Sequence, residues 1–340
     1  MQEYRKQRKI EHIENYLRSF TKSDPLFNDV YIEHRALNEI NFDEIDTSVE
    51  FLGKKLPFPL MINAMTGGSD MSSDINEDLS NICYEFKIPM AVGSQKIVLE
   101  DDSLIDSFKV VKEMSDGEFP VIGNLNANCS IEELKKASDL IDATAMQLHL
   151  NSAQELVMPE GDRNFKGIYD NIKKLVKEFD KDIIVKEVGF GIGKKDIELL
   201  NEIGVKYIDI SGHGGTNFIE IEDMRNFDMD FSDLYNWGIP TAKCLIDAKK
   251  VQGDFKIISS GGVSNANYIV KSLILGADIC AMSGEILSYL LRGGYDYTIN
   301  FIKELMYKTK MIMALLGVKN IEQLKKVDYK LTGKLRQLCK

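Results

Sequence analysis

Short apolar runs alternate with longer amphipathic segments along most of this chain of 340 residues. A short, continuous apolar run is typical of a β-strand that is buried on both faces, as in a parallel sheet covered by helices. Eight such runs are present: Pro59–Met65, Pro89–Gly93, Pro120–Leu125, Ala143–Leu150, Ile183–Val188, Tyr207–Ile210, Lys256–Ser260 and Asp278–Met282. The pattern therefore predicts eight buried strands.

The segments between these runs carry apolar residues at helical spacing. We expect helices over Asp74–Phe86, Ile131–Leu140, Ile168–Phe179, Lys195–Ile203 and Ala266–Leu275, with two more from about Glu3 to Phe20 and after Tyr297. Eight strands that alternate with helices are what a (β/α)₈ TIM barrel requires. A doubly wound sheet is the alternative, but the dinucleotide fingerprint is missing. With seven prolines and no linker-like stretch, we predict one domain over 1–340, in which 1–20 form a helical arm.

The charge balance narrows the possible partners. Lys and Arg number 42 and Asp and Glu 53, which gives a net charge of −11. Such an acidic chain is a poor match for nucleic acid or an anionic membrane, and an anionic small molecule would need a locally basic site. The five cysteines are scattered without a CxxC pair, as in a reduced intracellular protein. No signal peptide or membrane-spanning run is apparent. We expect a cytoplasmic homo-oligomer.

Glycine clusters follow the last strands, where barrel enzymes bind phosphate. Gly261-Gly262 follow the seventh run, and Ser283-Gly284 follow the eighth. Glycine lets backbone N–H groups approach a ligand closely, and the hydroxyls of Ser211 and Thr216 could add donors. A tight turn also needs glycine without any ligand. Two clusters at the expected strands favour a phosphate group.

Lys186 lies inside the otherwise apolar fifth run, next to Glu187. A buried ammonium is costly unless it is paired or used. Neighbouring residues of a strand point to opposite faces, so we expect Lys186 at the barrel mouth rather than in an ion pair with Glu187. There it could lie beside an anionic ring such as reduced flavin, or form a Schiff base.

The fourth run ends in a cluster of polar residues: His149, Asn151, Gln154 and Glu155. One carboxylate among neutral polar groups suits Mg²⁺ that also binds substrate phosphates, although a lone Glu is more often solvated or paired. Arg8, Lys9 and His12 share the first predicted helix, either as a solvated face or as a site for a second phosphate. No GxSxG, Walker or HExxH motif supports hydrolysis or zinc chemistry.

These motifs together resemble those of the type 2 isopentenyl-diphosphate isomerases, over nearly the whole chain. The residues that carry the resemblance are Arg8-Lys9 with His12, Asn63-Ala64-Met65-Thr66-Gly67-Gly68, His149-Leu150-Asn151, Gln154-Glu155-Leu156, Met158-Pro159-Glu160-Gly161, Lys186-Glu187-Val188-Gly189-Phe190-Gly191, Gly214-Gly215-Thr216 and Lys326-Val327-Asp328-Tyr329. The resemblance implies a (β/α)₈ barrel that interconverts isopentenyl and dimethylallyl diphosphate by a 1,3-allylic proton shift. It also implies reduced FMN, Mg²⁺, and NADPH as the reductant of FMN.

The resemblance also implies roles for individual residues. The FMN ring would contact Ala64, Met65, Thr66, Ser94, Asn124 and Lys186, and its phosphate end would lie on Ser211, Thr216, Gly261, Gly262, Val263, Ser283 and Gly284. The substrate diphosphate would be held by Arg8, Lys9, Ser94, Gln95, Lys96, His149 and Asn151. Glu155 would bind Mg²⁺. Gln154 would lie at the reacting carbons and, with Lys186, act in catalysis.

Two positions depart from the family pattern. Lys96 stands where many members have Arg, which replaces a bidentate fork by a point charge. His213 stands where they have Arg or a small residue, and His213-Gly214-Gly215 is similar to a motif of the FMN-dependent 2-hydroxy-acid oxidases. In those enzymes an Arg follows the two glycines, whereas here it is Thr216. The alternatives are therefore such an oxidase, or a flavin-free phosphate-binding lyase or sensor.

Overall fold

The eight predicted strands form one closed parallel barrel. The computed structural model describes residues 2–19, 23–225 and 228–340. The barrel strands are β4 (Leu60–Ile62), β5 (Met90–Ala91), β6 (Val121–Asn126), β7 (Ala145–Leu150), β8 (Asp182–Glu187), β9 (Tyr207–Asp209), β10 (Lys256–Ser259) and β11 (Ile279–Met282). They pair in the order β10-β11-β4-β5-β6-β7-β8-β9. The predicted (β/α)₈ fold is confirmed.

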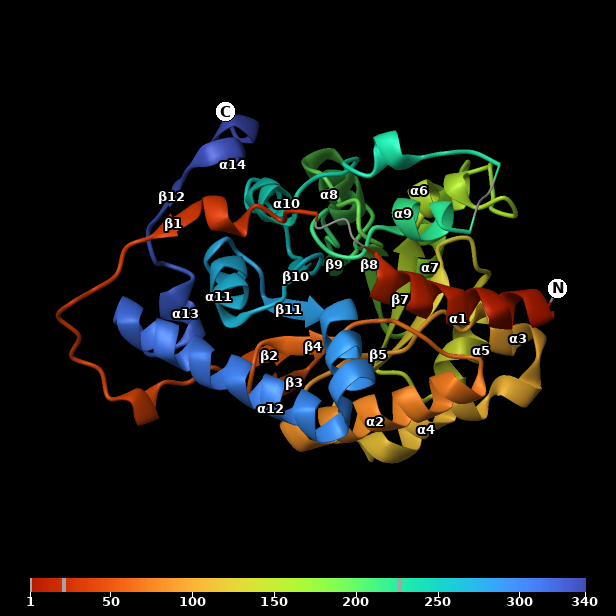
Figure 1. The fold of residues 1–340 in the computed structure, drawn as a ribbon, viewed down its shortest axis with the longest axis horizontal. Helices are drawn as coiled ribbons and strands as arrows, with labels where there is room; N and C mark the ends of the chain where they lie inside the picture. Colours follow the sequence, from red (N-terminus) through yellow and green to blue (C-terminus); the bar gives the residue numbers. More distant parts are fainter. Residues whose placement is uncertain (1, 20–22, 226–227) are drawn as a thin grey trace.

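Helices follow the strands and form the outer layer (Figure 1). They are α2 (Asp70–Phe86), α3 (Lys96–Glu100), α4 (Asp106–Ser115), α5 (Ile131–Leu140), α6 (Ser152–Val157), α7 (Ile168–Glu178), α8 (Lys194–Glu202), α9 (Phe218–Asp223), α10 (Thr241–Ala248), α11 (Ala266–Ile274) and α12 (Gly284–Leu316). Local caps explain several boundaries. At α5, for example, Ser130 and Glu133 form a capping box.

The helix expected after Tyr297 is present as the second part of α12. Gly294 has a non-helical backbone (φ 80°, ψ −176°) and divides α12 into two helical parts. The first part follows Ser283 and is the eighth barrel helix, and the second begins after Gly294, close to the expected position.

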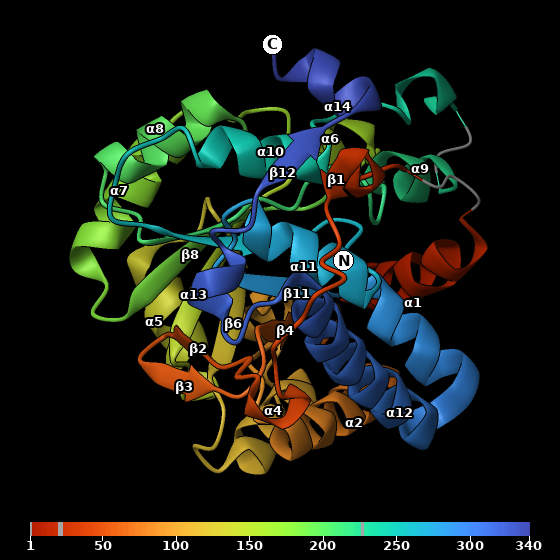
Figure 2. The same ribbon diagram turned by 90° about the vertical axis from the view of Figure 1, so that its left-hand side faces the viewer.

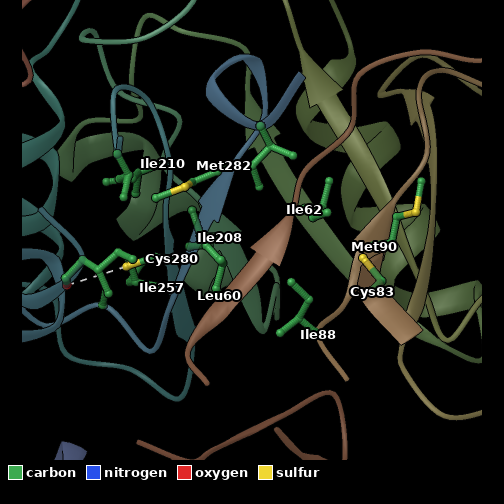
Figure 3. Packing of buried hydrophobic residues seen from close by; sticks show 14 of the residues in the cluster. Leu60, Ile62, Cys83, Ile88, Met90, Ile208, Ile210, Ile257, Cys280 and Met282 are labelled. Atoms are coloured by element: carbon green, nitrogen blue, oxygen red, sulfur yellow. Dashed lines mark hydrogen bonds between the residues drawn. The ribbon is translucent and has the colours of Figure 1, made fainter. Parts of the chain in front are cut away.

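The core separates into two layers because strand residues alternate in direction. Leu60 and Ile62 of β4 point outward and pack beneath the helices with residues such as Met282 (Figure 3). Met61 points inward and belongs to a second cluster inside the barrel. Cys83, Cys129, Cys244 and Cys280 are buried and unbonded, and Cys339 is partly exposed. The four buried cysteines thus act as small apolar residues of the core.

A short hairpin closes the barrel at the end where its strands begin. It consists of β2 (Val49–Phe51) and β3 (Lys54–Leu56), which pair antiparallel. Phe51 packs edge-on against Tyr207, the first residue of β9, with the ring centroids 5.4 Å apart. Phe51 and Leu56 also join the cluster inside the barrel. The opposite end, where the strands terminate, is left for ligands.

Two strands outside the barrel, one from each end region of the chain, pair on its surface. β1 (Val30–Ile32) pairs antiparallel with β12 (Tyr329–Leu331), close to α14 (Gly333–Leu338) (Figure 2). The remaining helices are α1 (Gln2–Arg18), α13 (Ile321–Leu324) and the 3₁₀ turns at Phe27–Asp29, Phe42–Glu44, Asp102–Leu104 and Ser232–Leu234. The predicted arm is therefore helical, although Phe20 lies outside the described residues.

α1 lies beside α9, over the end of the barrel where the strands terminate (Figure 1). Among the residues that the structure describes, no helix is both long and apolar enough to cross a membrane.

Candidate functional site

A single cavity of about 1290 Å³ lies at the C-terminal ends of the barrel strands. Every residue that the resemblance assigned to a ligand lines it, except Gln95. Pockets for one small ligand usually measure about 300–1,000 Å³. The cavity can therefore hold a cofactor and a substrate together.

Gln95 is the exception, and its assignment to the diphosphate is wrong for this structure. Its side chain is fully buried. The amide donates to Ala137 O at 2.8 Å and accepts from Asn124 N at 3.0 Å. Gln95 thus joins α5 to β6 beneath the cavity wall, whereas its neighbours Ser94 and Lys96 line the cavity.

One end of the cavity is built from glycine backbone. Gly261 and Gly262 follow β10 with left-handed φ angles of 93° and 78°. A Cβ atom at Gly262 would overlap Gly214 O of the loop after β9, so the two loops are in direct backbone contact. The hydroxyl-bearing Ser211, Thr216 and Ser283 line the same cavity. This donor set fits a phosphate monoester such as that of FMN.

Lys186 is the penultimate residue of β8, and its side chain lies on the cavity wall, as the alternation predicted. Its Nζ donates to Glu187 O at 2.7 Å, while the Glu187 carboxylate accepts backbone N–H groups, including those of Val188 and Gly189 at 2.7 Å. Burial lowers the pKa of Lys186, and the charges of Asp209 and Glu187 oppose that shift. The ammonium therefore faces the cavity with Asp209 as its neighbour on β9.

A chain of buried amide side chains connects the Asp209 carboxylate to His149. Asp209 Oδ2 accepts from Asn63 Nδ2 (2.6 Å), Asn63 Oδ1 accepts from Gln147 Nε2 (2.8 Å), and Gln147 Oε1 accepts from Asn124 Nδ2 (3.2 Å). Asn124 Oδ1, 2.7 Å from His149 Nδ1, can then only accept. Because the Asp209 carboxylate can only accept hydrogen bonds, it fixes for each amide in the chain which end donates and which end accepts. His149 consequently carries its proton on Nδ1.

His149 is neutral in this setting. Burial, with a contribution from the Lys186 charge, lowers the pKa of His149 to about 3. Its Nε2 is therefore an acceptor.

Gln154 of α6 contacts a carboxylate that sequence reasoning missed. Its Nε2 donates to Glu222 Oε1 at 2.7 Å, and His12 Nε2 of α1 lies 2.8 Å from the same oxygen. Burial raises the pKa of Glu222, but the hydrogen bond and charge of His12, the bond from Gln154 and the charge of Arg225 together lower it to about 2. Glu222 lies in the segment Phe218-Ile219-Glu220-Ile221-Glu222-Asp223, which directly follows Gly214-Gly215-Thr216-Asn217. Its position after the sixth strand is the feature of the sequence that could have identified Glu222 as a site residue.

Glu155, the residue after Gln154 in α6, is the carboxylate predicted to bind metal. Its Oε1 accepts from Asn151 Nδ2 at 2.9 Å, and its Oε2 accepts from Asp162 N at 2.8 Å. Within residues 2–19, 23–225 and 228–340, no three His, Cys, Asp or Glu side chains gather as metal ligands. A single carboxylate fits Mg²⁺ only where phosphate oxygens and water complete the shell.

The N-terminal arm reaches over the mouth of its own barrel. Lys9 Nζ donates to Gly67 O and, at 3.3 Å, to Ser94 O. Arg8 Nη1 lies 3.5 Å from Glu160 Oε1. Lys96, the first residue of α3, pairs with Glu133. Arg8 and Lys9 are thus in place on the cavity wall, while the charge of Lys96 is already partly balanced.

His213 is buried, and it is not among the residues that line the cavity. Its backbone N–H donates to Ile239 O and its carbonyl accepts from Thr241 N. Burial lowers the pKa of His213. The histidine that the oxidase alternative requires as a base is therefore turned away from the ligand space.

The comparisons with known proteins agree with this geometry. Residues 143–330 match the family model described as FMN-dependent dehydrogenase. An isopentenyl-diphosphate delta-isomerase of Staphylococcus haemolyticus is 37% identical over 331 residues, covering 97% of this chain and 95% of its own. An isopentenyl-diphosphate delta-isomerase of Listeria innocua is 38% identical over 333 residues, covering 97% of this chain and 93% of its own.

Solved structures with a similar fold are more distant in sequence. A flavocytochrome b2 variant with sulfite bound superposes with a TM-score of 0.70 at 17% identity, covering 97% of this chain and 81% of its own. A mandelate oxidase variant gives a TM-score of 0.66 at 13% identity, covering 95% and 92%. At such low identity these matches concern the fold alone.

Proposed function

The chain belongs to the FMN-dependent, type 2 isopentenyl-diphosphate delta-isomerases, and we propose that it interconverts isopentenyl and dimethylallyl diphosphate using reduced FMN and Mg²⁺. The observation that carries the proposal is the shared cavity. A glycine-lined phosphate end, a buried lysine, and a second polar end with Arg8, Lys9 and one carboxylate all face the same space. The two ends suit two different phosphate-bearing molecules.

We assign the cofactor to the half of the cavity between Ser211 and Gly284. The backbone of Gly261-Gly262 and the hydroxyls of Ser211, Thr216 and Ser283 would hold the FMN phosphate. When bound in its reduced form, FMN supplies an electron-rich ring that stabilises positive charge developing on the alkene, and exchangeable protons. The Lys186 ammonium beside the ring would favour its anionic reduced form. NADPH would serve only to reduce it.

We assign the diphosphate to the half of the cavity beneath α1. Arg8 and Lys9 would provide its positive charge, and Asn151 a hydrogen bond. His149 could join them only by taking up a proton on Nε2, because its Nδ1–H is already committed to Asn124. Binding the remote diphosphate in this way would orient the reacting carbons toward Gln154.

Glu155 would bring Mg²⁺ to the diphosphate. A diphosphate adds about two to three negative charges next to a carboxylate, which is unfavourable without a cation. Mg²⁺ prefers oxygen ligands and bridges one carboxylate to phosphate oxygens. Asn151 and the backbone of Asp162 hold the carboxylate of Glu155 in one orientation for this role.

The test is conversion of isopentenyl diphosphate by the FMN-loaded protein under anaerobic conditions with Mg²⁺ and NADPH or dithionite. We expect dimethylallyl diphosphate to form, and to form only when the flavin is reduced. The same preparation with oxidised FMN is the control. O₂ consumption with a 2-hydroxy acid and no isomerisation would instead establish the oxidase alternative.

A further inference from the structure

Arg225 joins three separate segments at the edge of the cavity. It follows α9, and only 7% of its side chain is exposed. Its Nε lies 2.8 Å from Glu11 Oε2 of α1, its Nη2 lies 3.3 Å from Glu160 Oε1 of the loop after α6, and its Nη1 pairs with Glu222 Oε2. A guanidinium offers five donors in a fixed planar fork, which allows one side chain to bind several carboxylates.

Because Arg225 pairs with one oxygen of the Glu222 carboxylate, the other oxygen can bind residues that line the cavity. Arg225 takes Oε2, whereas Oε1 accepts from Gln154 Nε2 at 2.7 Å and lies 2.8 Å from His12 Nε2. The Glu222 side chain is fully buried. A buried carboxylate that loses its cationic partner is strongly destabilised. The orientation of Glu222, and through it that of Gln154, thus depends on Arg225.

The attachment of α1 to the barrel includes several polar contacts. Besides the contacts of Glu11 and His12, Asn15 Nδ2 donates to Ile221 O at 3.2 Å, and Ser19 Oγ donates to Glu220 Oε2 at 2.7 Å. Among the described side chains of the helix, Ile13 is buried in the core and Leu17 packs against it. The ion pair of Glu11 with Arg225 adds to these contacts and lies on the same helix as Arg8 and Lys9, so it helps to hold both residues over the cavity.

We propose that Arg225 is a positioning residue that couples closure of the N-terminal arm to the orientation of the Glu222–Gln154 pair. The Nε of its guanidinium group holds α1 through Glu11, and the Nη1 holds the Glu222 carboxylate, which contacts Gln154. Closing the arm over a diphosphate and aligning Gln154 are then one event. The part of this inference that concerns the reaction rests on the proposed function.

The test uses the full-length, FMN-loaded protein with inorganic pyrophosphate and Mg²⁺ as the probe. Arg225→Met removes both links, Arg225→Lys keeps the charge without the fork, and Glu11→Gln cuts the link to α1 alone. Arg18→Met, at an exposed position at the end of α1, is the matched control. Hydrogen exchange of the backbone amides from Glu11 to Leu17 and calorimetric pyrophosphate binding are measured for each variant.

We expect Arg225→Met to raise both the exchange rate of α1 and the dissociation constant for pyrophosphate about tenfold, and to lower kcat as well. Arg225→Lys should fall between the wild type and Arg225→Met. Glu11→Gln should speed exchange and weaken pyrophosphate binding, and raise KM, while kcat stays near that of the wild type. Arg18→Met should change none of these quantities.

Unchanged α1 exchange and pyrophosphate affinity in Arg225→Met would overturn the proposal. If that variant fails to fold, Glu11→Gln decides, because its side chain is one-third exposed (34%). A Glu11→Gln protein that matches Arg18→Met would also overturn the proposal. If the wild type does not isomerise at all, the proposed function fails, but exchange and pyrophosphate binding still test Arg225.

Discussion

The state of His149 shows how much a single residue depends on its surroundings. The amide chain from Asp209 keeps the proton on Nδ1, and burial lowers the pKa of His149 to about 3. The folded-state pKa thus lies below the ordinary value of 6.5. As the pH falls, the unfolded chain takes up a proton at this histidine before the folded protein does. The contribution of neutral His149 to the stability of the folded protein is complete above pH 6.5 and is lost as the pH falls from 6.5 toward 3.

We therefore predict that the stability of the wild type falls more steeply than that of His149→Gln when the pH is lowered from 7.5 to 5.0. The difference should be about 1 kcal/mol, below the full linkage value because the ring borders an open cavity. Urea unfolding of FMN-free protein measures it without a contribution from cofactor binding. Equal losses of stability in the two proteins would show that His149 titrates normally in the folded state.

Glu155 provides the sharpest test of the metal site. Glu155→Gln keeps the size of the side chain and removes the charge that Mg²⁺ needs. We expect the Mg²⁺ concentration for half-maximal activity to rise at least about tenfold, while FMN affinity is unchanged because the flavin phosphate is assigned to the other end of the cavity.

Asp162→Asn is the matched control for Glu155, since it removes a neighbouring carboxylate but keeps the backbone N–H that orients Glu155. If both variants show the Mg²⁺ dependence of the wild type, Glu155 is not the ligand.

At the scale of elements, the loops after β9 and β10 determine one another's shape. Gly262 has a φ of 78° and leaves no room for a side chain, because a Cβ atom would meet Gly214 O. Gly117, in the loop between α4 and β6, has a similar φ of 71° but open space around it. Substituting each glycine by alanine therefore distinguishes the cost of backbone strain, present at both positions, from the cost of a steric overlap, present only at Gly262.

We expect Gly117→Ala to cost about 1 kcal/mol of stability, from the left-handed backbone alone. Gly262→Ala should cost more, and should also weaken FMN binding by at least about tenfold, because the loops must separate. Urea unfolding and fluorescence titration with FMN measure the two effects. Equal FMN affinity in both variants would argue against a phosphate site at this end of the cavity.

For the whole molecule, the distribution of charge matters more than its sum. The net charge is −11, yet the Lys and Arg residues that line the cavity (Arg8, Lys9, Lys96, Lys186 and Arg292) equal its Asp and Glu residues in number (Asp24, Glu155, Glu160, Asp162 and Glu285). The five basic residues come from the N-terminal arm, helix α3, strand β8 and helix α12. A cavity whose Lys, Arg, Asp and Glu residues balance admits an anionic ligand more readily than the acidic remainder of the protein does.

The barrel and much of the cavity wall could be predicted from the pattern of residues along the chain. A strand that is buried on both faces is a continuous apolar run in the sequence. The runs Pro59–Met65 and Ala143–Leu150 therefore located β4 and β7 without knowledge of the strands with which they pair. The period of two residues placed Lys186 on the cavity side and Glu187 away from it. Gly261-Gly262 could be recognised because their position after a late strand is a local property.

Features that depend on contacts between distant segments could not be predicted from the sequence pattern. The Gln95 side chain lies under the cavity wall because Ala137 and Asn124 offer it hydrogen-bond partners there, and the backbone of His213 is bonded to Ile239 and Thr241. Glu222 and Arg225 join the site because closing the barrel brings α9 against α1 and α6. Nothing near Arg8 in the sequence shows that the arm returns to its own barrel. These positions follow from contacts between segments that are distant in sequence, such as the 58 residues between Lys9 and Gly67 and the 68 between Gln154 and Glu222, which a local pattern cannot encode.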